Sequence, residues 1–192
     1  MAFSTLLLIM IALAVRCDGR NEKFVCRYFL GPNASREQYR LCEERGDDFD
    51  AILEGNAFGD IFCGKRFRLH PWNCSSEQNL VQMSYAHFWL RDGTKEGAYV
   101  EAVRTAGMVQ ILARYCESGR IKDCHCRREL ADELTDGQGW IWSGCPQKLR
   151  YAKRVAWEFL RSELDQYDND ILLRRWIRAN MEVGMKVSKT MS

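Results

Sequence analysis

Four cysteines are crowded between Cys116 and Cys145, and their spacing constrains the fold more than any other feature of the chain. The other two are Cys124 and Cys126, so all four lie within thirty residues. Cysteines at this density either bind a metal ion or form disulfides, and the redox compartment decides between these chemistries. The compartment is therefore the first property to infer from the rest of the sequence.

An apolar run near the N-terminus predicts that compartment. Leu6–Val15 is about ten apolar residues long, and residues 12–14 have the A-x-A form of a signal-peptide cleavage site. The run is too short to span a bilayer, which needs about 20 residues. We therefore interpret residues 1–19 as a secretory signal and residues 20–192 as the mature domain. The alternative, a buried N-terminal helix, leaves the charged stretch Arg16–Arg20 as an unexplained continuation.

Composition favours a single exported globular domain. About 170 residues remain after cleavage, enough for one hydrophobic core, and a net charge of +2 gives no reason to invoke nucleic acid. The N-x-S sequons at Asn33 and Asn73 are candidate glycosylation sites. No second apolar run is long enough for a transmembrane helix. We therefore expect secretion to the extracellular space or matrix.

The C-terminal portion is more basic than the rest. From Pro146 onward the sequence has ten Lys or Arg residues against six Asp or Glu residues. A solvated helix face explains this excess most simply. The alternative is a surface for an anionic glycan such as heparan sulfate.

Helical periodicity runs through most of the chain. Four helices are predicted, beginning at a capping box over Ser35–Gln38, near Lys95, near Pro146 and near Asp170. The first could be interrupted at Gly46, and the second is expected to end before Gly119. Its inward positions are predicted to be Tyr99, Ala102, Val103, Ala106, Val109 and Ala113. The apolar positions of the last helix are Leu172, Leu173, Trp176, Ile177 and Val183. Any sheet is at most a short hairpin around Gly137–Trp142, so the expected fold is a mainly α, disulfide-stapled bundle with cysteine-rich loops.

The number and spacing of the cysteines favour disulfides over metal binding. Nine cysteines are present, and Cys17 lies at the edge of the signal, which leaves eight. Metal binding by Cys116 with Cys124-His125-Cys126 is disfavoured, because zinc sites usually use C-x₂₋₄-C spacing. Disulfides would each contribute roughly 2–4 kcal/mol. Eight cysteines permit 105 pairings, and spacing alone does not choose among them.

Several segments resemble, in order, the N-terminal domain of Wnt ligands. Glu96–Gly107 (EGAYVEAVRTAG) is similar to the family's E-x-A-[FY]-x-x-A-[IV]-x-x-A-G. Cys116–Cys126 and Trp142–Cys145 are similar to its C-x₇-C-x-C and W-G-G-C. Upstream matches are Cys26-Arg27, Gln38-x-x-Leu41-Cys42, Ile52-x-Glu54-Gly55-x-Ala57 and Cys63-x₃-Phe67-x₄-Trp72-Asn73-Cys74. The resemblance covers about Cys26 to Ser192 and implies a helical domain with a saposin-like core.

The resemblance also implies disulfides and partners. The implied pairs are Cys63–Cys74, Cys116–Cys124 and Cys126–Cys145, which leaves Cys26–Cys42 as the fourth. Wnt ligands bind the Frizzled cysteine-rich domain and LDL-receptor-related co-receptors in developmental signalling. Both are therefore expected partners of this chain, with no catalysis and no cofactor.

The sequence departs from the family pattern at several places. Pro71 stands where members usually have Arg, and Ser143 replaces the first Gly of W-G-G-C. Ala179–Met185 resembles the family's H-N-N-E-x-G-R with three replacements. The lipidated hairpin C-K-C-H-G-x-S-G-S-C and the C-terminal cystine-rich domain do not occur before Ser192, so no lipidation site is predicted here. The chain is thus expected to be a portion of a full-length ligand or a short secreted antagonist.

Two other classes of function are less consistent with these residues. A secreted hydrolase needs a nucleophile or metal beside a base, but His70, His87 and His125 lie in no G-x-S-x-G or H-E-x-x-H motif. No catalytic or metal-binding residue is predicted. A saposin-like lipid-binding module would need an apolar cavity lined by several helices.

Overall fold

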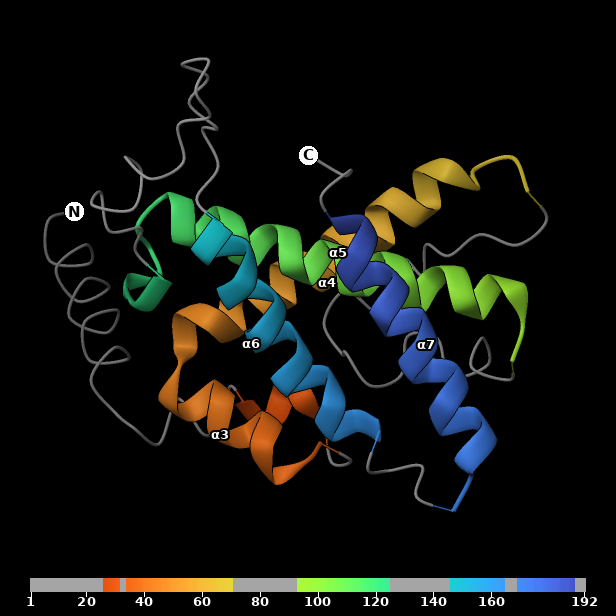
Figure 1. The fold of residues 1–192 in the computed structure, drawn as a ribbon, viewed down its shortest axis with the longest axis horizontal. Coiled ribbons are helices and arrows are strands. Elements are labelled where there is room, and N and C mark those ends of the chain that lie inside the picture. Colours follow the sequence, from red (N-terminus) through yellow and green to blue (C-terminus); the bar gives the residue numbers. More distant parts are fainter. Residues whose placement is uncertain (1–25, 32–33, 71–92, 125–145, 165–168, 189–192) are drawn as a thin grey trace, which may run out of the picture.

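The computed structural model describes residues 26–31, 34–70, 93–124, 146–164 and 169–188, and every regular element in these ranges is helical (Figure 1). The elements, in order, are α3 (Arg36–Glu44), α4 (Gly46–Arg66), α5 (Lys95–Glu117), the 3₁₀ turn η2 (Lys122–Cys124), α6 (Pro146–Leu164) and α7 (Ile171–Val187). This confirms the mainly α, disulfide-stapled fold. The hairpin considered around Gly137–Trp142 lies outside the described residues.

The capping box at Ser35 starts α3 as predicted. The Ser35 hydroxyl accepts a hydrogen bond from the Gln38 amide at 3.1 Å, and the Gln38 side chain accepts one from the Ser35 amide at 2.9 Å. These two bonds satisfy donors that the first turn leaves unpaired. The helix then ends at Glu44, and α4 begins at Gly46 after a non-helical Arg45. The predicted interruption is therefore real, and it lies one residue before Gly46.

Helix α5 is the central element, and α4, α6 and α7 all pack against it (Figure 1). The Thr94 side chain caps its N-terminus by accepting from the Gly97 amide at 3.0 Å. At the other end Gly119 takes a positive φ of 76°, as expected for the residue after a helix C-cap. Both predicted boundaries are correct to within a residue or two.

The single inward stripe predicted for α5 is incomplete. Val103, Ala106 and Val109 are buried as expected, whereas the other three predicted positions are only half-buried. Every residue from Val103 to Leu112 is buried, so α5 is covered around its whole circumference. Sequence periodicity identifies one apolar face, but it does not show that three other helices cover the rest.

Glycines make the crossing of α4 over α5 unusually close. Gly55 and Gly59, one turn apart on α4, lie against the backbone of α5. A β-carbon on Gly55 would collide with the Cα of Met108, and one on Gly107 would collide with the Gly55 carbonyl oxygen. The two backbones therefore touch with no side chain between them.

Helix α7 crosses α5 in a similar way. A β-carbon on Gly184 would collide with the carbonyl oxygen of Ala102 and approach the Thr105 side chain. Ile177 and Met181 are buried on the same side of α7. Leu172 and Val183, predicted among the apolar positions of this helix, are instead exposed, at 78% and 47%.

Candidate functional site

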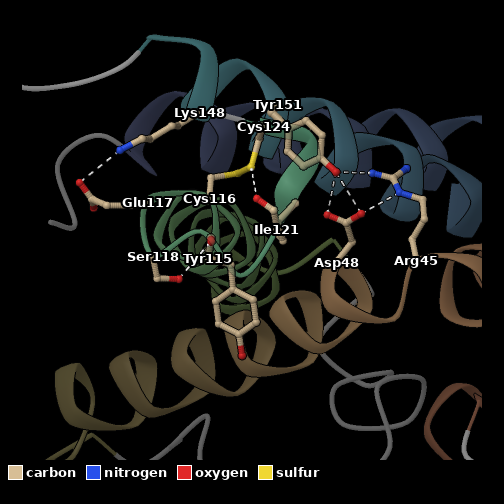
Figure 2. Close-up of a disulfide and its surroundings, with 10 residues drawn as sticks. All are labelled: Arg45, Asp48, Tyr115, Cys116, Glu117, Ser118, Ile121, Cys124, Lys148 and Tyr151. Atoms are coloured by element: carbon tan, nitrogen blue, oxygen red, sulfur yellow. Dashed lines mark hydrogen bonds and ion pairs between the residues drawn. A yellow bond between two sulfur atoms is a disulfide. The ribbon is translucent and has the colours of Figure 1, made fainter. Parts of the chain in front are cut away.

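Two disulfides lie wholly within the described residues, and they join Cys26 to Cys42 and Cys116 to Cys124. The pairs are those named from the resemblance. Cys116 closes the last turn of α5, and Cys124 ends η2, so the bond folds the chain back over the end of the central helix (Figure 2). Cys63 is also disulfide-bonded.

The other predicted site residues lie outside the described residues. They are the cysteines Cys74, Cys126 and Cys145 and the sequon asparagines Asn33 and Asn73. Their pairing and glycosylation stay predictions.

A buried polar cluster lies beside the Cys116–Cys124 bond and connects α4 to α6 (Figure 2). The Tyr151 hydroxyl donates to Asp48 at 3.0 Å and accepts from the Arg45 guanidinium at 3.0 Å. Arg45 also donates to Asp48 at 2.7 Å and to Glu158 at 3.2 Å. Burial raises the pKa of Asp48, and the positive charge of Arg45 opposes that rise. The non-helical Arg45 between α3 and α4 is thus positioned by Asp48 of α4 and by Tyr151 and Glu158 of α6.

A second polar cluster joins the C-terminal end of α5 to α4. The Tyr115 hydroxyl donates to Glu54 on α4 at 2.6 Å and accepts from Arg120 at 2.6 Å. Arg120 also donates to Asp50 at 2.8 Å, and its guanidinium lies 4.2 Å from the centre of the Tyr115 ring. Burial and the Glu54 hydrogen bond raise the pKa of Tyr115 to about 12. The loop after α5 is therefore bound to α4 by charge, while the Cys116–Cys124 disulfide binds it to the end of α5.

The raised pKa of Tyr115 predicts an alkaline loss of stability. Because the folded pKa of about 12 exceeds the unfolded value near 10, the contribution of this phenol is complete below about pH 10. It is lost as the pH rises through about 12. Isotope-labelled tyrosine followed by NMR should show a resonance that titrates at about pH 12 and that disappears in Tyr115→Phe. In Glu54→Gln the same resonance should titrate earlier, and an unchanged midpoint there would contradict the role of Glu54.

The two described disulfides should contribute unequally to stability. Chain-entropy arguments give about 2.5 kcal/mol for a loop of 8 residues and about 3 kcal/mol for one of 16. We therefore expect the free energy of unfolding to fall by about 2.5 kcal/mol in Cys116→Ser/Cys124→Ser and by about 3 kcal/mol in Cys26→Ser/Cys42→Ser. Denaturant titration of the purified proteins measures both. A larger loss for the Cys116 pair would show that burial, and not loop length, dominates.

A buried ion pair at the α4–α5 crossing was missed from the sequence. Glu101 and Arg104, 2% and 3% exposed, lie 3.4 Å apart on adjacent turns of α5. Arg104 also donates to the Asn56 side chain of α4 at 2.5 Å. The only sequence feature that could have indicated this ion pair is the occurrence of polar residues between apolar ones in α5. It is ambiguous, because charged residues at that spacing usually face solvent.

The metal-binding side-chain types of the described residues do not gather into a metal site. No group of three His, Cys, Asp or Glu side chains in these ranges could hold a metal ion. His70 is exposed in the turn after α4 and packs edge-on against Phe67, while His87 and His125 lie outside the described ranges. None of the described helices is long and apolar enough to cross a membrane.

Fold and cysteine framework together define a disulfide-stapled, mainly helical domain. A family model described as the wnt family matches residues 31–192. That match includes well over half of the sequence, and the chain belongs to the Wnt family.

Individual Wnt proteins are similar over most of this chain. Protein Wnt-9a of Gallus gallus is 30% identical over 154 residues, which are 80% of this chain and 40% of that protein. Protein Wnt-16 of Mus musculus is 30% identical over 152 residues, 77% of this chain and 41% of that protein. Protein Wnt-16 of Bos taurus is 29% identical over 190 residues, 94% and 50% respectively. The chain thus spans about half, or less, of the length of the curated relatives it matches.

Proposed function

We propose that this chain is the helical domain of a secreted Wnt-type signalling ligand that binds Frizzled receptors and LDL-receptor-related co-receptors. The observation that carries the proposal is a contact between two of the sequence motifs that resemble the Wnt family. Gly55, from the Ile52–Ala57 motif, lies directly against Gly107, the last residue of the Glu96–Gly107 motif. Motifs far apart in the sequence thus meet at the centre of the fold. This supports family-type architecture and not a chance match of short motifs.

The basic C-terminal helices support an additional extracellular partner. The α6 and α7 helices run side by side over the same face of α5, and they carry exposed cations such as Arg150, Arg161, Arg175 and Lys186 (Figure 1). Heparan sulfate is a chemically suitable ligand for such a surface, because it is an extended polyanion. Its binding should weaken as salt is raised.

Receptor binding can be tested with the purified 192-residue chain. Biolayer interferometry against immobilised ectodomains of the co-receptor and the Frizzled cysteine-rich domain should detect saturable binding to at least one. The Cys116→Ser/Cys124→Ser variant serves as a destabilised control and should bind more weakly. A folded wild-type chain that binds neither ectodomain would overturn the proposal.

A cell assay separates a ligand from an antagonist. The chain is added to Wnt-responsive reporter cells, alone and together with a full-length Wnt-9a. Activation by the chain alone supports the ligand, and inhibition of the added Wnt-9a supports the antagonist. No effect in either arm counts against both.

A further inference from the structure

The C-terminal end of α4, which lies far from α3, carries exposed apolar side chains together with cations (Figure 1). Its three apolar side chains, Ile61, Phe62 and Leu69, are 50%, 40% and 88% exposed. None of the three packs against a hydrophobic cluster of the described residues. We call the α4 tip these three residues and the three exposed cations between and beside them, Lys65, Arg66 and Arg68.

A tight turn places two residues of the tip at its corner. The His70 amide donates to the Phe67 carbonyl oxygen at 2.9 Å, which closes a four-residue turn with Arg68 and Leu69 in its central positions. The Phe67 ring packs edge-on against His70 at 5.2 Å and against Tyr99 of α5 at 4.8 Å. Phe67 thus anchors the turn to α5, whereas Arg68 and Leu69 stay outside this contact.

The last turns of α4 add to the same exposed end. On a helical projection Ile61, Phe62 and Lys65 fall within an arc of about 100°, with Lys65 between the two apolar positions. Cys63, which is buried, lies about 100° or more from each of them on the same projection. The side of α4 that carries the tip residues is therefore turned away from the side that enters the core.

The α4 tip is positively charged without a local counter-charge. Residues 61–70 include one lysine and two arginines, and they contain no Asp or Glu. Lys65, Arg66 and Arg68 form no ion pair with another described residue. In the nearby first turn of α5, Lys95 and Glu96 offset one another. The tip is therefore complementary in charge to an anionic surface.

The combination of charge and apolar exposure distinguishes between classes of anionic partner. A polysaccharide such as heparan sulfate offers anionic groups but no apolar interior, so it would leave Phe62 and Leu69 in water. An anionic bilayer offers both, because cations meet the lipid headgroups while apolar side chains enter the layer below them. A projecting turn also suits a flat, deformable surface, whereas a folded protein would need a matching pocket.

We propose that the α4 tip is a membrane-contact site through which this chain binds the surface of an anionic bilayer. In the bound state Phe62 and Leu69 enter the interface, and the three cations contact the headgroups. The attachment is peripheral and reversible, because so few apolar side chains reach only the outer part of the bilayer. This inference does not rest on receptor binding, and the tip shares no residue with the basic helices α6 and α7.

Flotation of the purified 192-residue chain with lipid vesicles tests the proposal. The chain should bind vesicles of equal parts phosphatidylcholine and phosphatidylserine, and not vesicles of phosphatidylcholine alone. Raising the salt concentration should weaken this binding. Leu69→Ser should weaken it about tenfold, because the apolar side chain no longer enters the interface. Lys65→Ser/Arg68→Ser should weaken it about thirtyfold, because two cations near the headgroups are lost.

Matched variants on α6 and α7 provide the controls. Leu172→Ser removes a leucine of α7 that is also largely exposed, and Arg150→Ser/Arg161→Ser removes two exposed cations of α6. Both should bind the anionic vesicles nearly as well as the wild type. Because every substitution is at an exposed position, all variants should keep the thermal stability of the wild type.

Three results would overturn the proposal. The first is a folded wild-type chain that does not float with the anionic vesicles. The second is an equal loss in the α6 double variant, which would assign binding to overall charge. The third is undiminished binding by Leu69→Ser. Heparin binding that is lost in Lys65→Ser/Arg68→Ser, without any binding to vesicles, would identify a polysaccharide site instead.

Discussion

Glu101→Met is expected to lower the free energy of unfolding by about 3–5 kcal/mol, because it leaves the Arg104 guanidinium buried without its carboxylate. The guanidinium would retain only the Asn56 bond, and its Nη2 already lacks a hydrogen-bond partner among the described residues. A buried charge without a counter-ion loses hydration that the protein does not replace. Denaturant unfolding of the purified variant, with secreted yield as a second readout, measures the loss.

The double variant Glu101→Met/Arg104→Met is the matched control. Removing both charges and filling the space with apolar side chains is often neutral or stabilising. We therefore expect it to recover most of the stability that Glu101→Met loses. If both variants lost the same amount, the damage would come from altered packing at position 101 and not from an uncompensated charge.

Gly55→Ala is expected to destabilise the fold by about 3 kcal/mol, although alanine is the better helix former. Its methyl group would meet the backbone of α5 at Gly107 and Met108, which cannot move aside as a side chain can. The helices must separate, and the contacts along their crossing are lost. Thermal unfolding of the secreted protein gives the change.

The same glycine-to-alanine substitution at another position of α4 should have the opposite effect on stability. A β-carbon on Gly46 meets nothing within 4 Å. Gly46→Ala should therefore be neutral or stabilise by up to about 1 kcal/mol, by reducing the freedom of the unfolded chain. A similar loss in both variants would refute the close approach of α4 and α5 at Gly55.

Helix boundaries could be predicted because they depend on near neighbours in the sequence. The Ser35 capping box, the Gly119 stop and the start of α6 at Pro146 each involve groups within a turn or so of one another. The pairing of Cys116 with Cys124 came instead from resemblance to a family. Spacing left it open because many pairings are compatible with the same intervals.

The sequence by itself determined the helical class, the helix ends and the family motifs, since these depend on local spacing and composition. Only the tertiary structure decided which helix is central and which charges are buried. Glu101 and Arg104 are polar residues on an apolar helix, and nothing local distinguishes their burial from exposure. Leu172 and Val183 show the converse, because they continue the apolar pattern of α7 yet lie outside the core. Burial depends on which faces other helices cover, and contacts between residues far apart in the chain decide that.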